Sequence, residues 1–152
     1  MEFYQAYWPR LVAALAWATP RGEDAEDIAQ EAFARAYQHW PTVRTYERPD
    51  AWLFVTAYRL ASTLRRRVAL RRRRTQPEPD LAHDLYEPSL LGELLTTLPQ
   101  RQRAALLLRH YYGLSTKETA AAMRCPEGTV KSLLQRGVAA LRETLRSEER
   151  EA

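Results

Sequence analysis

Apolar residues recur at spacings of three and four along most of this chain, which is the period of an amphipathic α-helix. The first stripe predicts a helix over residues 2–18, which ends at the Thr-Pro-Arg-Gly break of 19–22, and the second predicts a helix over 23–40. Residues 41–50 are expected to form a loop before a third helix from about 51 to 74. The core-facing side chains of that helix are expected to be Trp52, Val55, Leu60, Leu64 and Val68.

The second half of the chain shows the same period in shorter pieces. Residues 90–98 predict a short apolar helix, and a further helix over 99–112 should stop at Gly113, because glycine favours helix ends. Ser115 and Glu118 match a capping box, in which each side chain binds a backbone amide at the helix start. With five glycines and no alternating β-branched runs, the sequence indicates an all-α protein.

Residues 114–145 combine a short helix, a tight turn and a longer helix. Pro126 suits the first helical position, since its missing N–H costs nothing there. The buried stripe of the longer helix is expected at Val130, Leu134, Val138, Leu141 and Leu145. The opposite face carries side chains that reach phosphates and base edges in the major groove, namely Thr129, Lys131, Ser132, Gln135 and Arg136. This pattern is typical of a helix-turn-helix DNA reader, although an antiparallel helical hairpin with a solvated polar face gives the same stripe.

Charge is distributed unevenly along the chain. The 152 residues carry 23 Lys+Arg against 19 Asp+Glu, a net charge of +4, and seven arginines lie within residues 65–74. These arginines repel one another, so phosphate binding explains them better than a merely soluble basic tail does. Nearby Tyr46, Trp52 and Tyr58 suit single-stranded DNA, whose unstacked bases lie on aromatic rings.

The second predicted helix has an acidic exposed face instead, which includes Asp27, Gln30, Glu31 and Arg35. Such a face is either solvated or a docking surface for another protein. Residues 75–89 contain three prolines and four acidic side chains, which is typical of a flexible linker. We therefore expect two small helical domains, 1–74 and 90–146, the second a helix-turn-helix, followed by a charged and frayed tail at 147–152.

Several function classes are excluded by what the sequence lacks. A lone cysteine, Cys125, forms no disulfide framework, fits a reducing cytoplasm and is expected to be a small buried residue in the turn. No apolar run approaches the ~20 residues of a membrane span, and the start of the chain does not match a signal peptide. His39, His83 and His110 are scattered without metal-ligand spacing. Neither enzyme activity nor a metal or cofactor is expected.

Three segments, in this order, resemble an RNA polymerase sigma factor of the extracytoplasmic-function type in the sigma-70 family. The helix by which that family docks on the clamp of the largest polymerase subunit is similar to DAEDIAQEAFARAY (24–37). The segment that melts and reads the minus-10 promoter element is similar to RPDAWLFVTAYRLASTLRRR (48–67). The minus-35 reading domain is similar to residues 98–145, and its hallmark phrase is close to CPEGTVKS (125–132).

The resemblance implies a cytoplasmic sigma factor that binds core RNA polymerase and directs promoter recognition, DNA melting and transcription initiation. Its implied partners are core polymerase, promoter DNA (duplex and melted strand) and an anti-sigma factor. The implied polymerase-binding residues are Asp27, Gln30, Glu31, Phe33 and Arg35. A flipped base would be captured at loop 43–50, and the implied minus-10 and melting residues are Tyr46, Trp52, Tyr58, Arg59, Ser62, Arg65, Arg66 and Arg67. The implied minus-35 residues are Arg124, Thr129, Lys131, Ser132, Gln135 and Arg136.

The chain also departs from the family pattern. Arg59 and Thr63 stand where many relatives have Asn and Asp, which points to an actinobacterial, sigma-E-like subgroup. Leu133 replaces an arginine of the recognition helix, and Gly137 replaces the usual alanine at up to ~1 kcal/mol of helix stability. The alternative function is a helix-turn-helix repressor or activator that does not replace the polymerase specificity subunit. It leaves the acidic helix and the arginine-rich segment unexplained, and no dimerisation element is evident.

Overall fold

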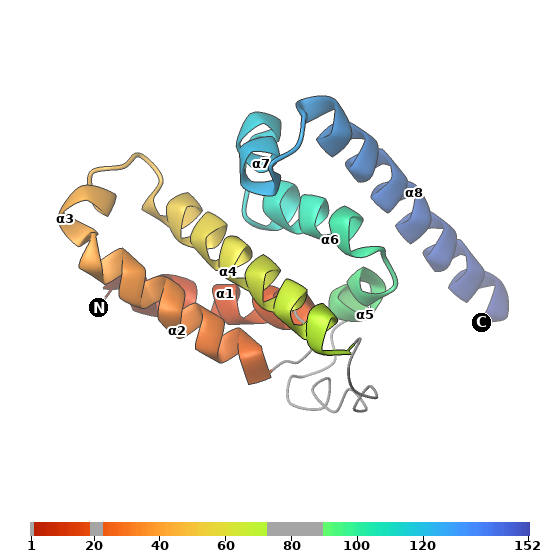
Figure 1. Ribbon diagram of the computed structural model, residues 1–152. Helices are drawn as coiled ribbons and strands as arrows, with labels where there is room; N and C mark the ends of the chain where they lie inside the picture. Colours follow the sequence, from red (N-terminus) through yellow and green to blue (C-terminus); the bar gives the residue numbers. More distant parts are fainter. Residues whose placement is uncertain (1, 19–22, 73–89) are drawn as a thin grey trace. The chain divides into compact units, whose positions relative to one another are not determined.

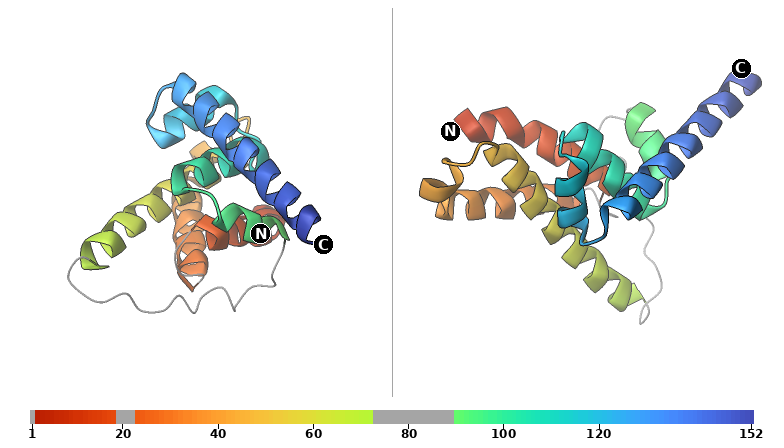
Figure 2. Two further views of the ribbon diagram at one scale, coloured as in Figure 1. Left: turned by 90° about the vertical axis from the view of Figure 1, so that its right-hand side faces the viewer. Right: turned by 90° about the horizontal axis from the view of Figure 1, so that it is seen from above.

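The computed structural model describes residues 2–18, 23–72 and 90–152, and the regular structure in these ranges is helical throughout, as the all-α prediction requires. The chain forms two compact units, Met1–Glu87 (unit 1) and Pro88–Ala152 (unit 2), both drawn in Figures 1 and 2. The division falls at the end of the segment expected to be a linker, residues 75–89. That segment lies outside the described residues, as do Arg73 and Arg74.

In its described part, unit 1 consists of α1 (Glu2–Ala18), α2 (Glu23–Gln38), α3 (Trp40–Val43) and α4 (Pro49–Arg72). α1 packs against α2 and α4, and α2 also packs against α4 (Figure 1). The first two helices end within two residues of their predicted bounds. Close packing is possible because the inner face of α2 is built from small, fully buried side chains, Ala25, Ala29, Ala32 and Ala36.

An aromatic cluster joins the beginning of α1 to the end of α2. Phe33 lies at its centre, with its ring centroid 4.9 Å from that of Tyr4 and 5.9 Å from those of Phe3 and Trp8. Tilted and edge-on ring pairs of this kind stabilise a core beyond their buried area. The cluster fixes α2 by its apolar side, and the opposite side of the helix stays exposed.

The face of α4 that packs in the core differs from the predicted one. Leu53, Phe54, Ala57 and Ala61 are fully buried, whereas the predicted Trp52, Val55, Leu60 and Leu64 are half-buried, and the Val68 side chain is outside the described part. The sequence of α4 holds apolar residues on more than one face. Packing against α1 and α2 selects the face that carries alanines at its centre, because only small residues let the helices approach closely.

The predicted loop at 41–50 is shorter than expected. Trp40–Val43 forms the short helix α3, with Pro41 in its first turn, and α4 already begins at Pro49. Both prolines occupy positions where a backbone N–H would have no helical partner. Residues 44–48 remain as the connection.

Unit 2 contains, in chain order, α5 (Leu90–Thr96), α6 (Gln100–Leu106), a π-helical turn (Leu107–Tyr111), α7 (Thr116–Met123) and α8 (Glu127–Glu151). The helix predicted over 99–112 is therefore one α-helical and one π-helical piece. It ends before Gly113, whose φ of 71° is a left-handed conformation that glycine adopts without strain. The predicted stop is confirmed.

Arg103 of α6 ties α5 to α6. Its Nε donates to the Leu95 carbonyl at 2.9 Å, and one terminal nitrogen, Nη2, donates to the carbonyls of Thr96 (3.3 Å) and Leu98 (3.0 Å). These carbonyls belong to the end of α5 and the residues just after it, where the helix leaves acceptors without intrahelical partners. The Arg103 guanidinium of α6 therefore caps the C-terminal end of α5.

α8 is longer than predicted and less buried at its end. Residues 147–151, expected as a frayed tail, continue the helix to Glu151, and its C-terminal end lies away from α7 (Figure 2). Of the predicted stripe, Val130 is fully buried, Leu134, Val138 and Leu141 are half-buried, and Leu145 is 40% exposed. None of the helices in the described ranges combines the length and apolarity that a membrane crossing requires.

Candidate nucleic-acid interface

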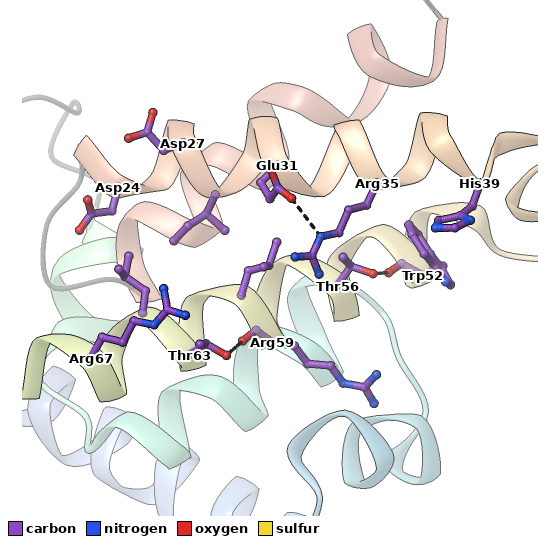
Figure 3. A pocket seen from close by; sticks show the side chains of 13 residues that line it. Asp24, Asp27, Glu31, Arg35, His39, Trp52, Thr56, Arg59, Thr63 and Arg67 are labelled. Carbon is purple, nitrogen blue, oxygen red and sulfur yellow. Dashed lines mark hydrogen bonds and ion pairs between the residues drawn. The ribbon is translucent and has the colours of Figure 1, made fainter. Parts of the chain in front are cut away.

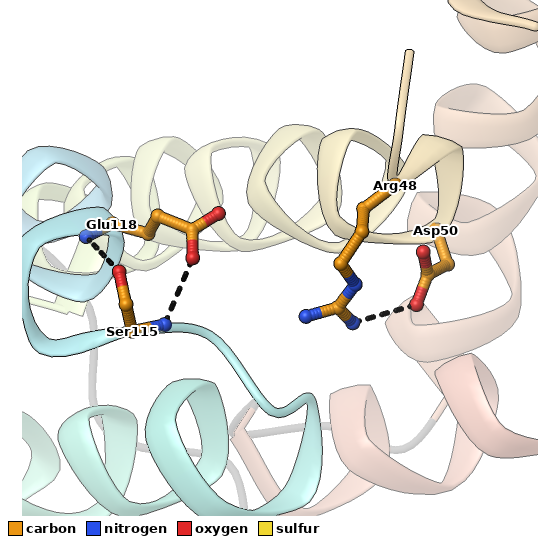
Figure 4. A network of polar contacts seen from close by, with 4 residues as sticks. All are labelled: Arg48, Asp50, Ser115 and Glu118. Carbon is orange, nitrogen blue, oxygen red and sulfur yellow. Dashed lines mark hydrogen bonds and ion pairs between the residues drawn. The ribbon is translucent and has the colours of Figure 1, made fainter.

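The start of α7 is built as the sequence predicts. The Ser115 hydroxyl accepts a hydrogen bond from the Glu118 amide at 3.0 Å, and the Glu118 carboxylate accepts one from the Ser115 amide at 2.9 Å (Figure 4). This reciprocal pair satisfies two amides that the helix itself leaves open. On the inner side of α7, Thr119, Ala120 and Ala122 are buried and α7 packs on α8.

The turn between α7 and α8 is tight. Arg124 adopts a left-handed conformation, with φ 55° and ψ 49°. Pro126, predicted as the first helical residue, is instead the N-cap of α8 (φ −65°, ψ 153°), and its carbonyl accepts the Thr129 amide at 3.0 Å and the Val130 amide at 3.2 Å. Cys125 is half-buried in the turn. Because proline has no polar side chain, the N-cap of α8 makes no side-chain hydrogen bond to the first turn of the helix.

The predicted minus-35 residues share the side of α8 opposite Val130 and Gly137, together with the turn before it. Lys131, Gln135 and Arg136 are exposed, as is Arg124, whereas Thr129 and Ser132 are half-buried. The structure adds Glu127 and Gly128, which are exposed at the start of the same helix. Helical spacing brings Thr129, Lys131, Ser132, Gln135 and Arg136 to one polar face of α8, and Arg124 lies in the turn just before it. Such a face can contact phosphates and base edges together.

Gly137 has a packing role that the sequence did not reveal. A Cβ at this position would lie 2.9 Å from Leu106 Cδ1 and 3.4 Å from Leu106 Cγ, because α6 crosses α8 at this point. The glycine is buried and lets the two helices approach. Glycine lowers the intrinsic stability of α8 here but allows α6 to cross closely on the side opposite its exposed polar face.

The predicted minus-10 residues lie on α4 and on the connection before it. Tyr46 is 44% exposed, Arg59 and Arg67 are exposed, and Trp52, Tyr58 and Ser62 are half-buried. The side chains of Arg65 and Arg66 fall outside the described part. One exposed and two half-buried aromatic side chains thus occur with exposed arginines along α4 and its entry. Aromatic rings can stack on bases, and arginines can pair with phosphates.

An ion pair fixes the entry to α4. The Arg48 guanidinium donates to the Asp50 carboxylate at 2.7 Å, and the Asp50 side chain is only 14% exposed (Figure 4). Asp50 lies in the first turn of α4, where a carboxylate is also favoured by the positive end of the helix. The pair ties the connection 44–48, which carries Tyr46, to the helix.

A groove runs between α2 and α4, and its two walls carry opposite charges. Asp24, Asp27 and Glu31 line it from α2, whereas Arg59 and Arg67 line it from α4. Figure 3 shows Arg35 of α2 pointing toward α4 and paired with Glu31 at 3.1 Å. The groove brings together residues that are more than thirty positions apart, so sequence patterns did not reveal it. Its remaining lining residues are Ile28, His39, Trp52, Thr56, Leu60, Thr63 and Leu64.

Four of the five predicted polymerase-binding residues are exposed on α2, namely Asp27, Gln30, Glu31 and Arg35. Phe33 is the exception. It is 3% exposed at the centre of the aromatic cluster, so it supports α2 from inside and cannot itself contact a partner. The sequence itself indicated that Phe33 is buried, because it lies four residues from Ala29 on the apolar side of the helix.

Comparison with known proteins accounts for both units. The sigma-70 region 2 family matches residues 3–76, and the sigma-70, region 4 family matches residues 89–141. The RNA polymerase sigma-E factor of Streptomyces coelicolor is 36% identical over 131 residues, which cover 83% of this chain and 74% of that protein. The ECF RNA polymerase sigma factor SigL of Mycobacterium tuberculosis is 34% identical over 131 residues, which cover 80% of this chain and 74% of that protein.

The fold itself recurs in a solved structure. The sigma factor RpoE from Bartonella quintana, crystallised with the anti-sigma factor NepR, superposes with a TM-score of 0.71 at 23% identity, covering 95% of this chain and 97% of that one. At this identity the similarity shows the fold alone. The two matched regions and the actinobacterial relatives show the family. The chain belongs to the sigma-70 family of RNA polymerase sigma factors, in the extracytoplasmic-function group that includes the sigma-E-like proteins.

Proposed function

We propose that this chain is a promoter-specificity subunit whose work is divided between its two units. As a sigma factor it binds core RNA polymerase and directs promoter recognition, DNA melting and transcription initiation, a regulatory role and not an enzymatic one. The observation that carries the division is the distribution of exposed charge. Unit 2 presents one basic-polar helix face, whereas unit 1 presents an acidic helix beside a cationic one.

Unit 2 reads the minus-35 element in this proposal. The exposed start of α8 enters the major groove, where Lys131 and Arg136 suit guanine and Gln135 suits adenine. Thr129, Ser132 and Arg124 lie beside them for contacts to the backbone. Leu133, which replaces a basic residue of the family pattern, is half-buried and leaves the contact set of this chain different from that of its relatives.

Unit 1 recognises and melts the minus-10 element. Arg59 and Arg67, with the neighbouring Arg65 and Arg66, hold phosphates along α4. Tyr46 on the connection 44–48 is placed to stack on an unpaired base, and Trp52, Tyr58 and Ser62 complete the surface. A base that has left the duplex is stabilised by such stacking, which shifts the DNA toward the melted state.

The acidic face of α2 docks on core polymerase. Asp27 and Glu31, with Gln30 and Arg35, are exposed while the other side of the helix is fixed by the aromatic cluster. A rigid acidic face is suited to a basic partner surface, and complementary charge accelerates and orients association. The protein would therefore act in the cytoplasm, where the polymerase is.

An anti-sigma factor is a further proposed partner. The sigma factor RpoE, which has the same fold, has been solved with the anti-sigma factor NepR, and CnrH, a second protein of this fold, with the cytosolic domain of CnrY. In this chain such a partner would hold the protein inactive by covering surfaces that the polymerase needs. Capture of a co-encoded protein that blocks assembly with core polymerase would support this partner.

In vitro transcription tests the proposed function. The purified chain, mixed with core polymerase from its own organism, should co-elute with the core and produce transcripts from promoters mapped by the 5′ ends of its dependent RNAs. Core polymerase alone should produce none of them. A chain that binds this DNA by itself, does not bind core polymerase and starts no transcript would instead be a helix-turn-helix repressor or activator.

A further inference from the structure

The turn between α7 and α8 holds an arginine where glycine is favoured. Arg124 is the one non-glycine residue with positive φ in the ranges that the structure describes. Its amide donates to the Ala121 carbonyl at 3.3 Å, and the Cys125 amide donates to the Ala120 carbonyl at 3.1 Å. These two bonds make a Schellman motif, whose left-handed position usually carries glycine because a Cβ is crowded there.

The hydrogen bonds of the turn do not require an arginine. Both are made by backbone amides and carbonyls, so a glycine at position 124 would keep them and remove the crowding. The Arg124 side chain is exposed, and within the described ranges its guanidinium has no hydrogen bond or ion pair. Arginine therefore lowers stability at this position without a compensating contact inside the described part of the chain.

The place of the turn indicates what the guanidinium contacts. Arg124 is exposed and lies three residues before Glu127, where α8 begins, and the exposed Lys131 and Gln135 follow within the next turns of that helix. When the start of a recognition helix enters the major groove, the residues just before it lie at the groove edge, against the sugar-phosphate backbone. Arginine is suited to this position because its planar guanidinium donates two parallel hydrogen bonds to a phosphate.

We propose that Arg124 is a phosphate anchor of the upstream promoter contact, and that the chain keeps it in a strained conformation at the expense of the stability of unit 2. The inference rests on the proposed function of unit 2 and adds a specific contact to it. The anchor positions α8 on the duplex and carries no sequence information, since phosphate contacts are the same for every base pair.

Three substitutions separate strain from charge. Arg124→Gly removes both, Arg124→Ala removes the charge and keeps the strain, and Arg124→Lys keeps both. Each full-length variant is assembled with core polymerase, and binding to a mapped promoter fragment is measured between about 0.05 and 0.2 M salt. The unfolding midpoint of unit 2 is followed in the free protein by hydrogen exchange of the α7 and α8 amides over a temperature series.

Arg124→Gly should raise the midpoint of unit 2 by about 4–8 °C and still bind the promoter about five- to tenfold more weakly at 0.1 M salt. The slope of log affinity against log salt should fall in magnitude by about 0.9, the value for one phosphate. Arg124→Ala should lose the same affinity without the gain in midpoint. Arg124→Lys keeps the charge but not the fork, so it should keep the wild-type salt slope and lose less affinity than Arg124→Ala. Arg101→Ala, which removes another exposed arginine of unit 2, should change neither the unfolding midpoint nor the promoter affinity and its salt slope.

The possible failures are distinguishable. If Arg124→Gly binds as tightly as wild type at every salt concentration, Arg124 is not an anchor, and if affinity falls with an unchanged salt slope, its contact is not with a phosphate. If the unfolding midpoint of unit 2 does not rise in Arg124→Gly, the proposal that Arg124 strains the turn is wrong. If wild-type holoenzyme itself fails to select the promoter, the proposed function fails, whatever the variants do.

Discussion

Single residues of unit 2 show how its packing competes with local helix preference. Gly137 and Gly128 lie on the same helix, but a Cβ at Gly137 would meet Leu106 at 2.9 Å, whereas a Cβ at Gly128 would meet nothing within 4 Å. Thr119 is fully buried, and its hydroxyl has no hydrogen-bond partner in the described ranges. Each of these positions supports a prediction whose sign follows from the surroundings and not from the residue type.

Gly137→Ala should destabilise unit 2 although alanine is the better helix former. The gain of about 1 kcal/mol in propensity is outweighed by overpacking, which typically costs about 1–3 kcal/mol, because the new Cβ would meet Leu106 Cδ1 at 2.9 Å and the buried Leu106 would have to shift. A net loss of about 1 kcal/mol is expected in urea unfolding. The matched control, Gly128→Ala, should be stabilising by about 0.5 kcal/mol, and equal effects of the two changes would contradict the close crossing.

Thr119→Val should stabilise unit 2 by about 1 kcal/mol. The substitution keeps the shape of the side chain and removes a buried hydroxyl without a partner, a group whose desolvation costs about 1–3 kcal/mol. Thr119→Ser serves as the opposite control, since it keeps the hydroxyl and loses a buried methyl group. Thermal unfolding should rank valine above wild type and serine below it. The reverse order would mean that the hydroxyl has a partner such as an ordered water.

At the scale of elements, the helix ends that carry a local signal were predictable, whereas the buried face of α4 was not. Ser115, Glu118 and Gly113 carry local signals that act through neighbouring backbone groups, so their roles followed from the sequence. The inner face of α4 did not, because its apolar residues surround the helix and only packing against α1 and α2 decides among them. The close crossing of α6 and α8 and the end-capping of α5 by Arg103 depend on tertiary packing in the same way.

Arg103→Ala should loosen α5 from unit 2. It removes hydrogen bonds to the carbonyls of Leu95, Thr96 and Leu98, and bonds from a charged donor contribute about 1.5–3 kcal/mol. A loss of about 2 kcal/mol is expected, with faster hydrogen exchange in α5. Arg103→Lys should recover only part of it, because an ammonium lacks the fork that reaches several acceptors at once. Arg101→Ala, two positions before Arg103 on the same helix, should be nearly neutral, and a similar loss there would show a general charge effect.

At the scale of the whole molecule, the two units divide the predicted site residues cleanly. The assignment to two domains and to the sigma-70 family followed from segments spread over nearly the whole chain, so no single pattern had to carry it. The opposed charges of the groove between α2 and α4 could not be predicted, because Asp27 and Arg67 come to line the same groove only through the packing of the two helices. The burial of Phe33, in contrast, follows from its spacing along α2, four residues from the buried Ala29.

Charge substitutions in the two units should have separable effects. Lys131→Ala with Arg136→Ala should weaken promoter binding about tenfold or more while core polymerase binding stays intact, since these exposed side chains support no fold contact in the described ranges. Asp27→Lys with Glu31→Lys should weaken core binding and leave duplex binding by unit 2 unchanged. Co-elution with core and promoter-fragment titration measure the two activities. Loss of both activities in both variants would contradict the division of labour.

Because each unit has its own core, moderate heat can unfold unit 2 while unit 1 stays folded. The protein would then change from a sigma factor that starts transcription into one that only competes for core polymerase. A substitution such as Arg103→Ala should lower the melting temperature of unit 2, whereas α1, α2 and α4 belong to unit 1. Between the two melting temperatures the chain would still occupy polymerase through α2 while having lost its upstream contact. Such a temperature-sensitive allele would be dominant over the wild-type copy in a cell, because it sequesters enzyme that it can no longer direct.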